Sequence, residues 1–204
     1  MKKLIVFLMM FLTASSTAFA LEEADYCTKG INVHGKTGRT VYNELCKRFV
    51  QNEAGYFITT FAKKNVSLCT TNEKEDEDLP CQGLGYLYTP EQDPRSIIND
   101  YKYFFKVLVE KYGNPGCNKE YFHFPYSAYD SDEDLAVAFA NGDYTIYAGW
   151  FSPSAKHAIA LQIVTQNDVV KIVIAFGDLE NRELFYKLKA KQEQDLISQA
   201  VDDM

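Results

Sequence analysis

The sequence lacks the short motifs by which many enzyme families are recognised. It contains no G-x-S-x-G elbow, no H-E-x-x-H zinc helix, no P-loop and no dinucleotide-binding fingerprint. Its three histidines, His34, His123 and His157, are isolated from one another and from cysteine, so none shows metal-ligand spacing. We therefore expect no cofactor and no metal, and no residue stands out as catalytic.

Long apolar runs and excess positive charge are also missing after residue 20. Before it, Lys2, Lys3 and the apolar run Leu4–Leu12 are typical of a short bacterial secretory signal, and Ala18-Phe19-Ala20 is an A-x-A cleavage site. Without those two lysines the formal charge falls from −7 to −9, a surface that repels nucleic acid and anionic lipid. We expect a signal peptide over 1–20, cleavage after Ala20, no membrane span, and a periplasmic or secreted protein.

Five cysteines follow the signal, which suits an oxidising compartment. Their odd number leaves at least one unpaired or joined to another chain. We favour a disulfide between Cys69 and Cys81, which would close an acidic loop and stabilise the fold by about 3 kcal/mol. Cys27 with Cys46 is a second candidate pair. Cys117 is then the candidate free thiol, and we do not expect it to be catalytic because no histidine lies at a telling spacing.

The stretch from Asp93 to Pro115 predicts one complete amphipathic helix. Asp93 is a good N-cap, and Pro94 fits the first helical position because its missing N–H costs nothing there. Apolar residues recur at three- and four-residue steps and form one wide face. Gly113 suits the position after the helix end, and Pro115 prevents continuation. A helix with so wide an apolar face requires a sheet to cover it.

The segments before this helix predict a strand, a helix and three more strands. Thr37 is expected to cap a first helix that runs to about Val50. The expected strands are Ile31 to His34, Tyr56 to Phe61, Val66 to Thr70 and Gly83 to Tyr88, the second and third forming a hairpin.

The segments after the helix predict an antiparallel meander and a charged C-terminal helix over 179–204. Asn141-Gly142 is the strongest hairpin signal in the chain. Expected strands lie near 121–126, 135–139, 144–150, 159–163 and 170–176.

This order predicts an α+β protein with one domain over 21–178. It consists of two helix-plus-antiparallel-sheet units, α-βββ over about 30–90 and α-ββββ over 93–178, and an internal duplication is possible.

Two acidic segments were considered as cation sites. Asp130–Asp134 begins like a calcium loop, but Leu135 stands where glycine is needed and Asn141 where glutamate is needed. The Glu73–Asp78 run, between the two cysteines of the favoured disulfide, is expected to be a solvated loop, and its role is left open.

Several segments resemble a loose family of uncharacterised secreted proteins of Gram-negative bacteria. The matching features are INVHG before a helix, YKYFFKVLVEKYGNP with its terminal K-Y-G-x-P, the strand AIALQI, and VVKIVIAFGDLEN, in which a last strand runs into Asp-x-x-Asn. Lys111–Pro115 and Asp178–Asn181 stand at those places. The resemblance covers most of the mature chain and implies no activity.

The missing catalytic constellation favours a non-catalytic binding module of the cell envelope, whose partner is another envelope or secreted protein. One alternative is an inhibitor or immunity-type protein that blocks a basic partner with the Glu73–Asp78 loop. Another is a hydrolase that uses a carboxylate or His157 with a neighbour brought close by folding. A polar pocket that holds two histidines and a carboxylate would favour chemistry. Binding would use an open sheet face or the loops Thr71–Pro80 and Ser127–Asp134.

Overall fold

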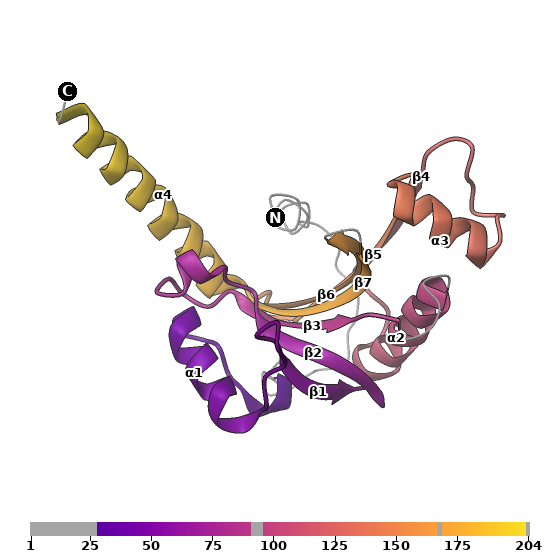
Figure 1. The fold of residues 1–204 in the computed structure, drawn as a ribbon, viewed down its shortest axis with the longest axis horizontal. Coiled ribbons are helices and arrows are strands. Elements are labelled where there is room, and N and C mark those ends of the chain that lie inside the picture. The colour runs from indigo at the N-terminus through magenta and orange to yellow at the C-terminus, as the bar shows by residue number, and fades with distance from the viewer. Residues whose placement is uncertain (1–27, 91–95, 167–168, 203–204) are drawn as a thin grey trace.

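The structure, a computed structural model, describes residues 28–90, 96–166 and 169–202. These residues contain four α-helices and one seven-stranded antiparallel sheet (Figure 1). The helices are α1 Gly38–Arg48, α2 Ile97–Tyr112, α3 Asp132–Asn141 and α4 Leu179–Asp202. The strands are β1 Phe57–Phe61, β2 Lys64–Thr70, β3 Gly83–Tyr88, β4 Cys117–Phe122, β5 Tyr144–Phe151, β6 His157–Gln166 and β7 Val169–Asp178. The predicted signal peptide, Cys27, Asp93 and Pro94 lie outside the described residues.

One ladder joins the two halves of the chain into a single sheet. Its strand order is β1-β2-β3-β7-β6-β5-β4, and the central pair β3–β7 runs from Gly83 opposite Gly177 to Tyr88 opposite Ile172. The predicted α+β class is confirmed. The expected division into two sheet units is not confirmed, because all seven strands in the described ranges belong to one sheet.

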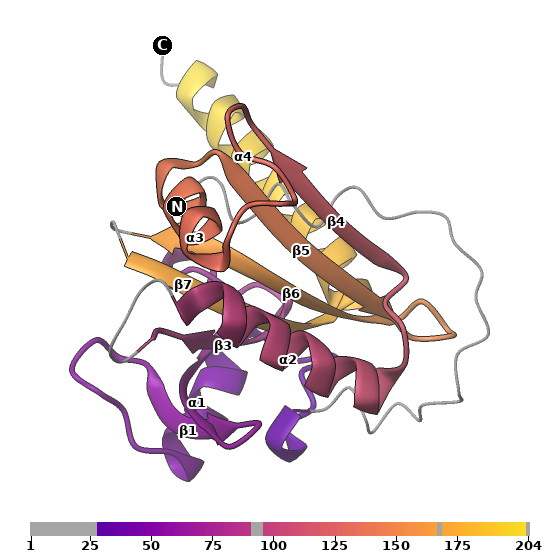
Figure 2. The same cartoon turned by 90° about the vertical axis from the view of Figure 1, so that its right-hand side faces the viewer.

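Three helices pack on the same face of this sheet, and α2 lies across it (Figure 2). The strand register places alternate residues of neighbouring strands on one side, so that Leu68, Tyr86, Ile174 and Leu161 share that face. Ring contacts join each helix to it: Tyr42 with Phe57, Phe104 with Tyr88, and Phe139 with Tyr144. The hydrophobic core lies between this face and the helices.

The start of α1 and the end of α2 follow their sequence signals, whereas α2 begins at Ile97 after Ser96 and not at the predicted Asp93–Pro94. The Thr37 hydroxyl accepts a hydrogen bond from the Thr40 N–H at 3.3 Å and caps α1. At the end of α2, Gly113 has φ of 76° and its N–H donates to the Val109 carbonyl, as the predicted stop requires. The predicted hairpin is also present, with Ala62 and Lys63 at positive φ between β1 and β2.

The strand predicted over 135–139 is wrong, because these residues belong to helix α3. The Ser131 hydroxyl caps the helix by accepting from the Asp134 N–H at 3.2 Å, and Gly142 ends it with φ of 83°. Asn141-Gly142 therefore marks a helix end and not a hairpin. Leu135, Ala138 and Phe139 are all buried, and their spacing of three and four residues is that of one helix face. The alternation of apolar residues with alanine made this helical spacing look like a strand.

Two other predicted strands need correction. Residues 31–34 form no strand; the Ile31 N–H donates to the Thr28 carbonyl, and Gly35 turns the chain with φ of 69°. The strand expected near 121–126 begins earlier and ends at Phe122, as β4. A loop of residues 123–130 follows it.

The predicted disulfide between Cys69 and Cys81 is also wrong, because both residues are free thiols. Cys69 lies on β2 opposite Gly85, and its thiol bonds to the Gly85 carbonyl, whereas the Cys81 thiol bonds to the Gly83 carbonyl. Cys117 is a free thiol as well, and it lies on β4, the edge strand at the far end of the sheet from β1 and β2. The pairing of exposed Cys46 with Cys27 stays a prediction.

Helix α4 continues from the end of β7 and projects away from the body of the molecule (Figure 1). Phe185 in its second turn is buried, but residues 190–199 are all exposed. None of the helices within the described ranges has the length and apolarity to cross a bilayer.

Two glycines of β3 give a matched test of the central ladder. A Cβ at Gly83 would collide with the carbonyl oxygen of Phe176, whereas one at Gly85 would meet only the Cys69 sulfur at 3.7 Å. We expect Gly83→Ala to lower the free energy of unfolding by about 2–3 kcal/mol and Gly85→Ala to change it little. Urea unfolding measures both, and equal effects would contradict the close approach of β3 and β7.

The free thiols are testable by mass spectrometry. When the purified protein is denatured without reductant and alkylated, we expect Cys69 and Cys81 each to take up the reagent. Burial raises the pKa of Cys81 to about 11 and that of Cys69 to about 12, so exposed Cys46 should react far faster than either in the native protein. A peptide pair linked through Cys69 and Cys81 would contradict the structure.

Candidate functional site

A polar cluster forms where β7 passes into α4. Asp178, the last residue of β7, is 1% exposed and places its two carboxylate oxygens in different bonds. Oδ1 accepts from the Asn181 N–H at 2.8 Å and so caps α4, while Oδ2 accepts from Nδ1 of His34 at 2.8 Å. The His34 side chain itself is half exposed. One buried carboxylate thus starts a helix and holds a histidine from the other end of the chain.

Asn181 completes this cluster from the first turn of α4. Its amide oxygen accepts from the Gly35 N–H at 3.1 Å, and its amide nitrogen donates to the carbonyls of Val33 at 2.8 Å and Cys81 at 2.9 Å. All of these groups are satisfied, as a 4% exposed amide requires. We call Asp178, Asn181 and the backbone of 33–35 and Cys81 the buried knot.

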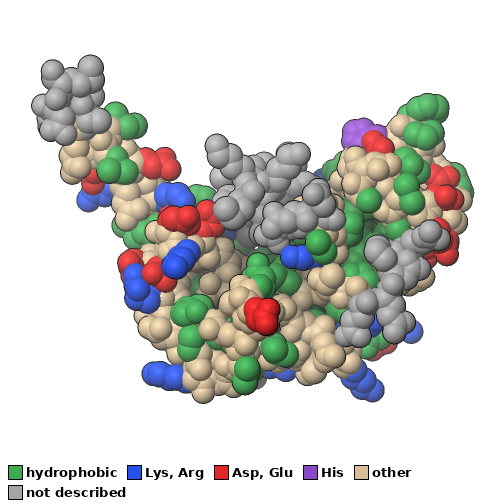
Figure 3. Space-filling model, in the orientation of Figure 1, with side chains coloured by type: hydrophobic (Ala, Val, Ile, Leu, Met, Phe, Trp, Pro, Cys, Tyr) green, Lys and Arg blue, Asp and Glu red, His purple; other side chains and the backbone are tan. Residues whose placement is uncertain are grey.

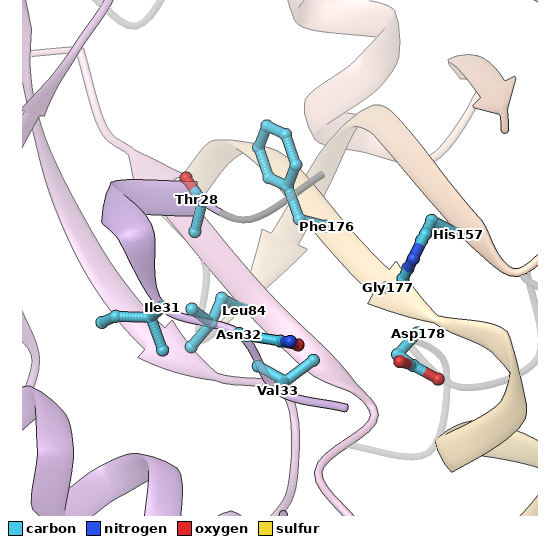
Figure 4. A pocket seen from close by; sticks show the side chains of 9 residues that line it. All are labelled: Thr28, Ile31, Asn32, Val33, Leu84, His157, Phe176, Gly177 and Asp178. Carbon is cyan, nitrogen blue, oxygen red and sulfur yellow. The ribbon is translucent and has the colours of Figure 1, made fainter. Parts of the chain in front are cut away.

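A shallow pocket lies beside the buried knot (Figure 4). The volume of the pocket, counted together with the open solvent space at its mouth, is about 280 Å³. His157 stands directly opposite Asp178 in the β6–β7 ladder, and both residues line the pocket. The other lining residues are Thr28, Ile31, Asn32, Val33, Leu84, Phe176 and Gly177. Folding therefore brings a carboxylate near two of the histidines, as the hydrolase alternative requires.

The chemistry of this cluster nevertheless fits a structural role better. A nucleophile activated by the His34–Asp178 pair would have to approach the other ring nitrogen, Nε2. Among the described residues, the group beside Nε2 is the Glu180 carboxylate, whose Oε2 lies 3.8 Å from Nε2. The Cys81 thiol is fully buried, donates to the Gly83 carbonyl and has its pKa raised to about 11 by burial, so it remains protonated at neutral pH.

Lys64, Tyr88 and Asp100 form a second polar cluster. Lys64 Nζ lies 2.5 Å from one oxygen of Asp100, and the Tyr88 hydroxyl donates to the other at 2.9 Å. Burial acts to lower the pKa of Lys64, but the bonds to Asp100 and Tyr88 outweigh it and the pKa is raised. A lysine that holds its proton is no nucleophile or base. The cluster ties β2 and β3 to α2.

The Glu73–Asp78 loop is bound to two helices by its own charges. Asp76 is buried and pairs with Lys189 of α4. Arg39 of α1 pairs with Glu77 at 2.8 Å and with Asp78 at 2.6 Å. Three of the five acidic side chains in this segment thus contact the protein's own basic groups.

The loop over residues 123–130 is the most exposed apolar feature among the described residues, and we call it the aromatic loop. Phe124 is 96% exposed and Tyr129 is 98% exposed. Tyr121, at the end of β4 beside the loop, is 47% exposed, and its ring lies 6.3 Å from that of Tyr147. Figure 3 shows hydrophobic side chains at the tip of the lobe that β4 and α3 form.

Local hydrogen bonds hold the aromatic loop in shape. The His123 N–H donates to Asp143 on the neighbouring segment at 2.8 Å, and the Tyr126 N–H donates to the His123 carbonyl at 3.0 Å. Asp130 then accepts from the Ser127 N–H at 2.7 Å, and its own N–H donates to the Ser127 carbonyl at 3.2 Å. The aromatic side chains are therefore displayed on a folded support.

The sequence-based candidates are distributed over the whole molecule. Among them, folding brings together Asp178, Asn181 and His34 in the buried knot, whereas His123 lies in the aromatic loop. In the described residues no group of histidine, cysteine and carboxylate side chains is placed to hold a metal. Phe124 and Tyr129 were missed as individual residues, and Pro125 between aromatic residues was the signal that this segment leaves the sheet.

Comparisons with known proteins found no match to a family model, to a curated protein or to a solved structure.

From the bonds of the buried knot we expect Asn181→Ala to destabilise the protein more than His34→Ala does. Asn181→Ala removes bonds to three backbone groups, of which the Val33 carbonyl keeps the Lys36 N–H as a donor, and should lower the free energy of unfolding by about 3 kcal/mol. His34→Ala should cost under about 1 kcal/mol, because its ring is half exposed and the α4 cap survives. Thermal and urea unfolding of both variants give the comparison. An equal loss for the two would contradict a structural role centred on Asn181.

Proposed function

We propose that this protein is a secreted or periplasmic, non-catalytic binding module that holds another envelope or secreted protein through the aromatic loop. The observation that carries the proposal is the near-complete exposure of Phe124 and Tyr129 in a folded loop. Covering a side chain of this size is worth about 1.5–3 kcal/mol, and aromatic residues commonly form the energetic centre of a protein interface.

The support of the loop favours binding in a second way. Its turns are held by Asp130, Ser127 and His123, so little conformational freedom remains to be lost when a partner docks. Tyr121, 47% exposed at the end of β4, adds a third exposed aromatic side chain next to the loop, and its ring rests against the buried ring of Tyr147. A partner would therefore contact a preformed aromatic ridge.

The two alternative functions have less support. A hydrolase that uses a carboxylate or His157 with a neighbour would act in the pocket that His157 and Asp178 line. The Asp178 carboxylate is occupied by the Asn181 N–H and by His34, whose Nε2 lies 3.8 Å from Glu180. An inhibitor that blocks a basic partner through the Glu73–Asp78 loop would have to compete with Lys189 and Arg39 for the same carboxylates. Both alternatives would be revived by a partner or substrate whose effect depends on those residues.

Two finer expectations belong with this proposal. The last strand of each half, β3 and β7, lies at the centre of the sheet, which supports an origin by internal duplication. The meeting of Gly35 from INVHG with Asn181 from Asp-x-x-Asn gives a physical reason for both motifs in the secreted family that the chain resembles.

The proposal is tested by capture from an envelope extract with the immobilised mature protein. For a partner recovered by the wild type, we expect the double variant Phe124→Ser, Tyr129→Ser to lose roughly tenfold in affinity or more, about 1.4 kcal/mol. Its thermal stability should be unchanged, because neither side chain packs in the core.

A matched control is Ile58→Ser on β1, at the opposite edge of the sheet, where a 55% exposed apolar side chain is also removed. It should retain full binding. Recovery of no partner, or equal binding by the double variant and the wild type, would overturn the proposal.

A further inference from the structure

The outer half of α4 is a helix without a surface to pack on. From Ala190 to Gln199 every side chain is exposed, and Leu196 and Ile197 are 65% and 66% exposed. Figure 3 shows hydrophobic side chains among charged ones along the projecting helix. A helical segment of this length is marginal in water by itself, because helix formation in proteins depends on packing of an apolar face. A second helix is therefore expected to cover it.

Apolar residues on α4 mark the face that a partner helix would cover. Leu184, Leu188 and Leu196 follow one another at steps of four or eight residues, with Gln192 between the last two. Residues at four-residue steps lie on one side of a helix. Leu184 and Leu188 are 47% and 37% exposed, so the stripe begins near the body and continues outward.

The charges of the exposed half identify the partner. Lys191 comes first, and Glu193 and Asp195 follow nearer the C-terminal end, whereas Lys187 and Lys189 pair with Glu183 and Asp76 of their own chain. This order is the reverse of the one that the helix dipole favours in a single helix. It is complementary to itself when two copies of the helix run antiparallel, since the basic part of each then faces the acidic part of the other.

We propose that α4 pairs with α4 of a second copy of this chain, antiparallel and centred on Gln192. In this register Leu188 of each copy faces Leu196 of the other, and Gln192 meets its own counterpart on the two-fold axis. Lys191 of each copy comes within reach of Asp195 of the other. A polar residue at the centre of an apolar contact fixes the register of paired helices. The contact is small, so the dimer forms in a concentration-dependent equilibrium.

This pairing is independent of the binding proposed for the aromatic loop, which lies on the opposite lobe of the molecule (Figure 1). It leaves the buried knot unchanged, because Asn181 and Phe185 are already covered within the chain.

Single cysteines test the register directly in a Cys27→Ser, Cys46→Ser background, which removes the exposed native thiol of Cys46 together with its predicted partner. Under mild oxidation Gln192→Cys should form a covalent dimer, whereas Ala190→Cys, exposed on the opposite side of the helix, should not. Leu188→Cys mixed with Leu196→Cys should cross-link, and Leu188→Cys alone should not. Cross-linking of Leu188→Cys with itself would show parallel pairing and overturn the proposal.

Charge exchange gives a second measurement on the same protein. Sedimentation equilibrium should show a mass that rises from monomer toward dimer with concentration. Lys191→Glu and Asp195→Lys should each weaken association at least roughly threefold, and the double variant should restore it. A monomer at every concentration, with no selective cross-link, would overturn the proposal.

Discussion

The buried amide of Asn181 is the constraint on which the arrangement of the chain depends. It bonds the turn at Val33 and Gly35 to the backbone of Cys81 and to the start of α4, so it joins the beginning, middle and end of the described chain. Asp178 beside it begins the same helix and binds His34. Because the Asp178 and Asn181 side chains are buried, removing either one takes bonds from several backbone groups at once. The central β3–β7 ladder holds the two halves together alongside this knot.

This constraint separates the part of the molecule that is fixed from the part available for contact. The knot contains a histidine–aspartate pair, yet its bonds are those of a helix cap and a turn clamp, and the nearby Cys81 thiol is held protonated by burial. The ion pairs of the acidic loop likewise serve to hold α1 and α4. Among the described residues, the most exposed large apolar side chains are Phe124 and Tyr129 of the aromatic loop, and the outer half of α4 exposes Leu196 and Ile197.

Local signals predicted the elements whose chemistry is local. Thr37 and Gly113 mark helix ends that the structure confirms, because capping depends on neighbouring residues alone. The prediction of a strand over 135–139 was wrong because apolar residues that alternate with alanine resemble a strand pattern. Alanine is also the strongest helix former. The partners of Asn181 come from segments far apart in sequence and gave no local signal. The exposure of Phe124 was equally hidden, since an aromatic residue in a sequence is more often part of a core.

Hydrogen exchange of the protein with and without its captured partner tests the central claim most directly, that the knot is structural and the contact surface is the aromatic loop. Partner binding should slow exchange over 121–130 and leave exchange at 33–35, Cys81 and 178–181 unchanged. Slower exchange around His34, His157 and Asp178, with none in the aromatic loop, would contradict it and place the functional site in the pocket beside the knot.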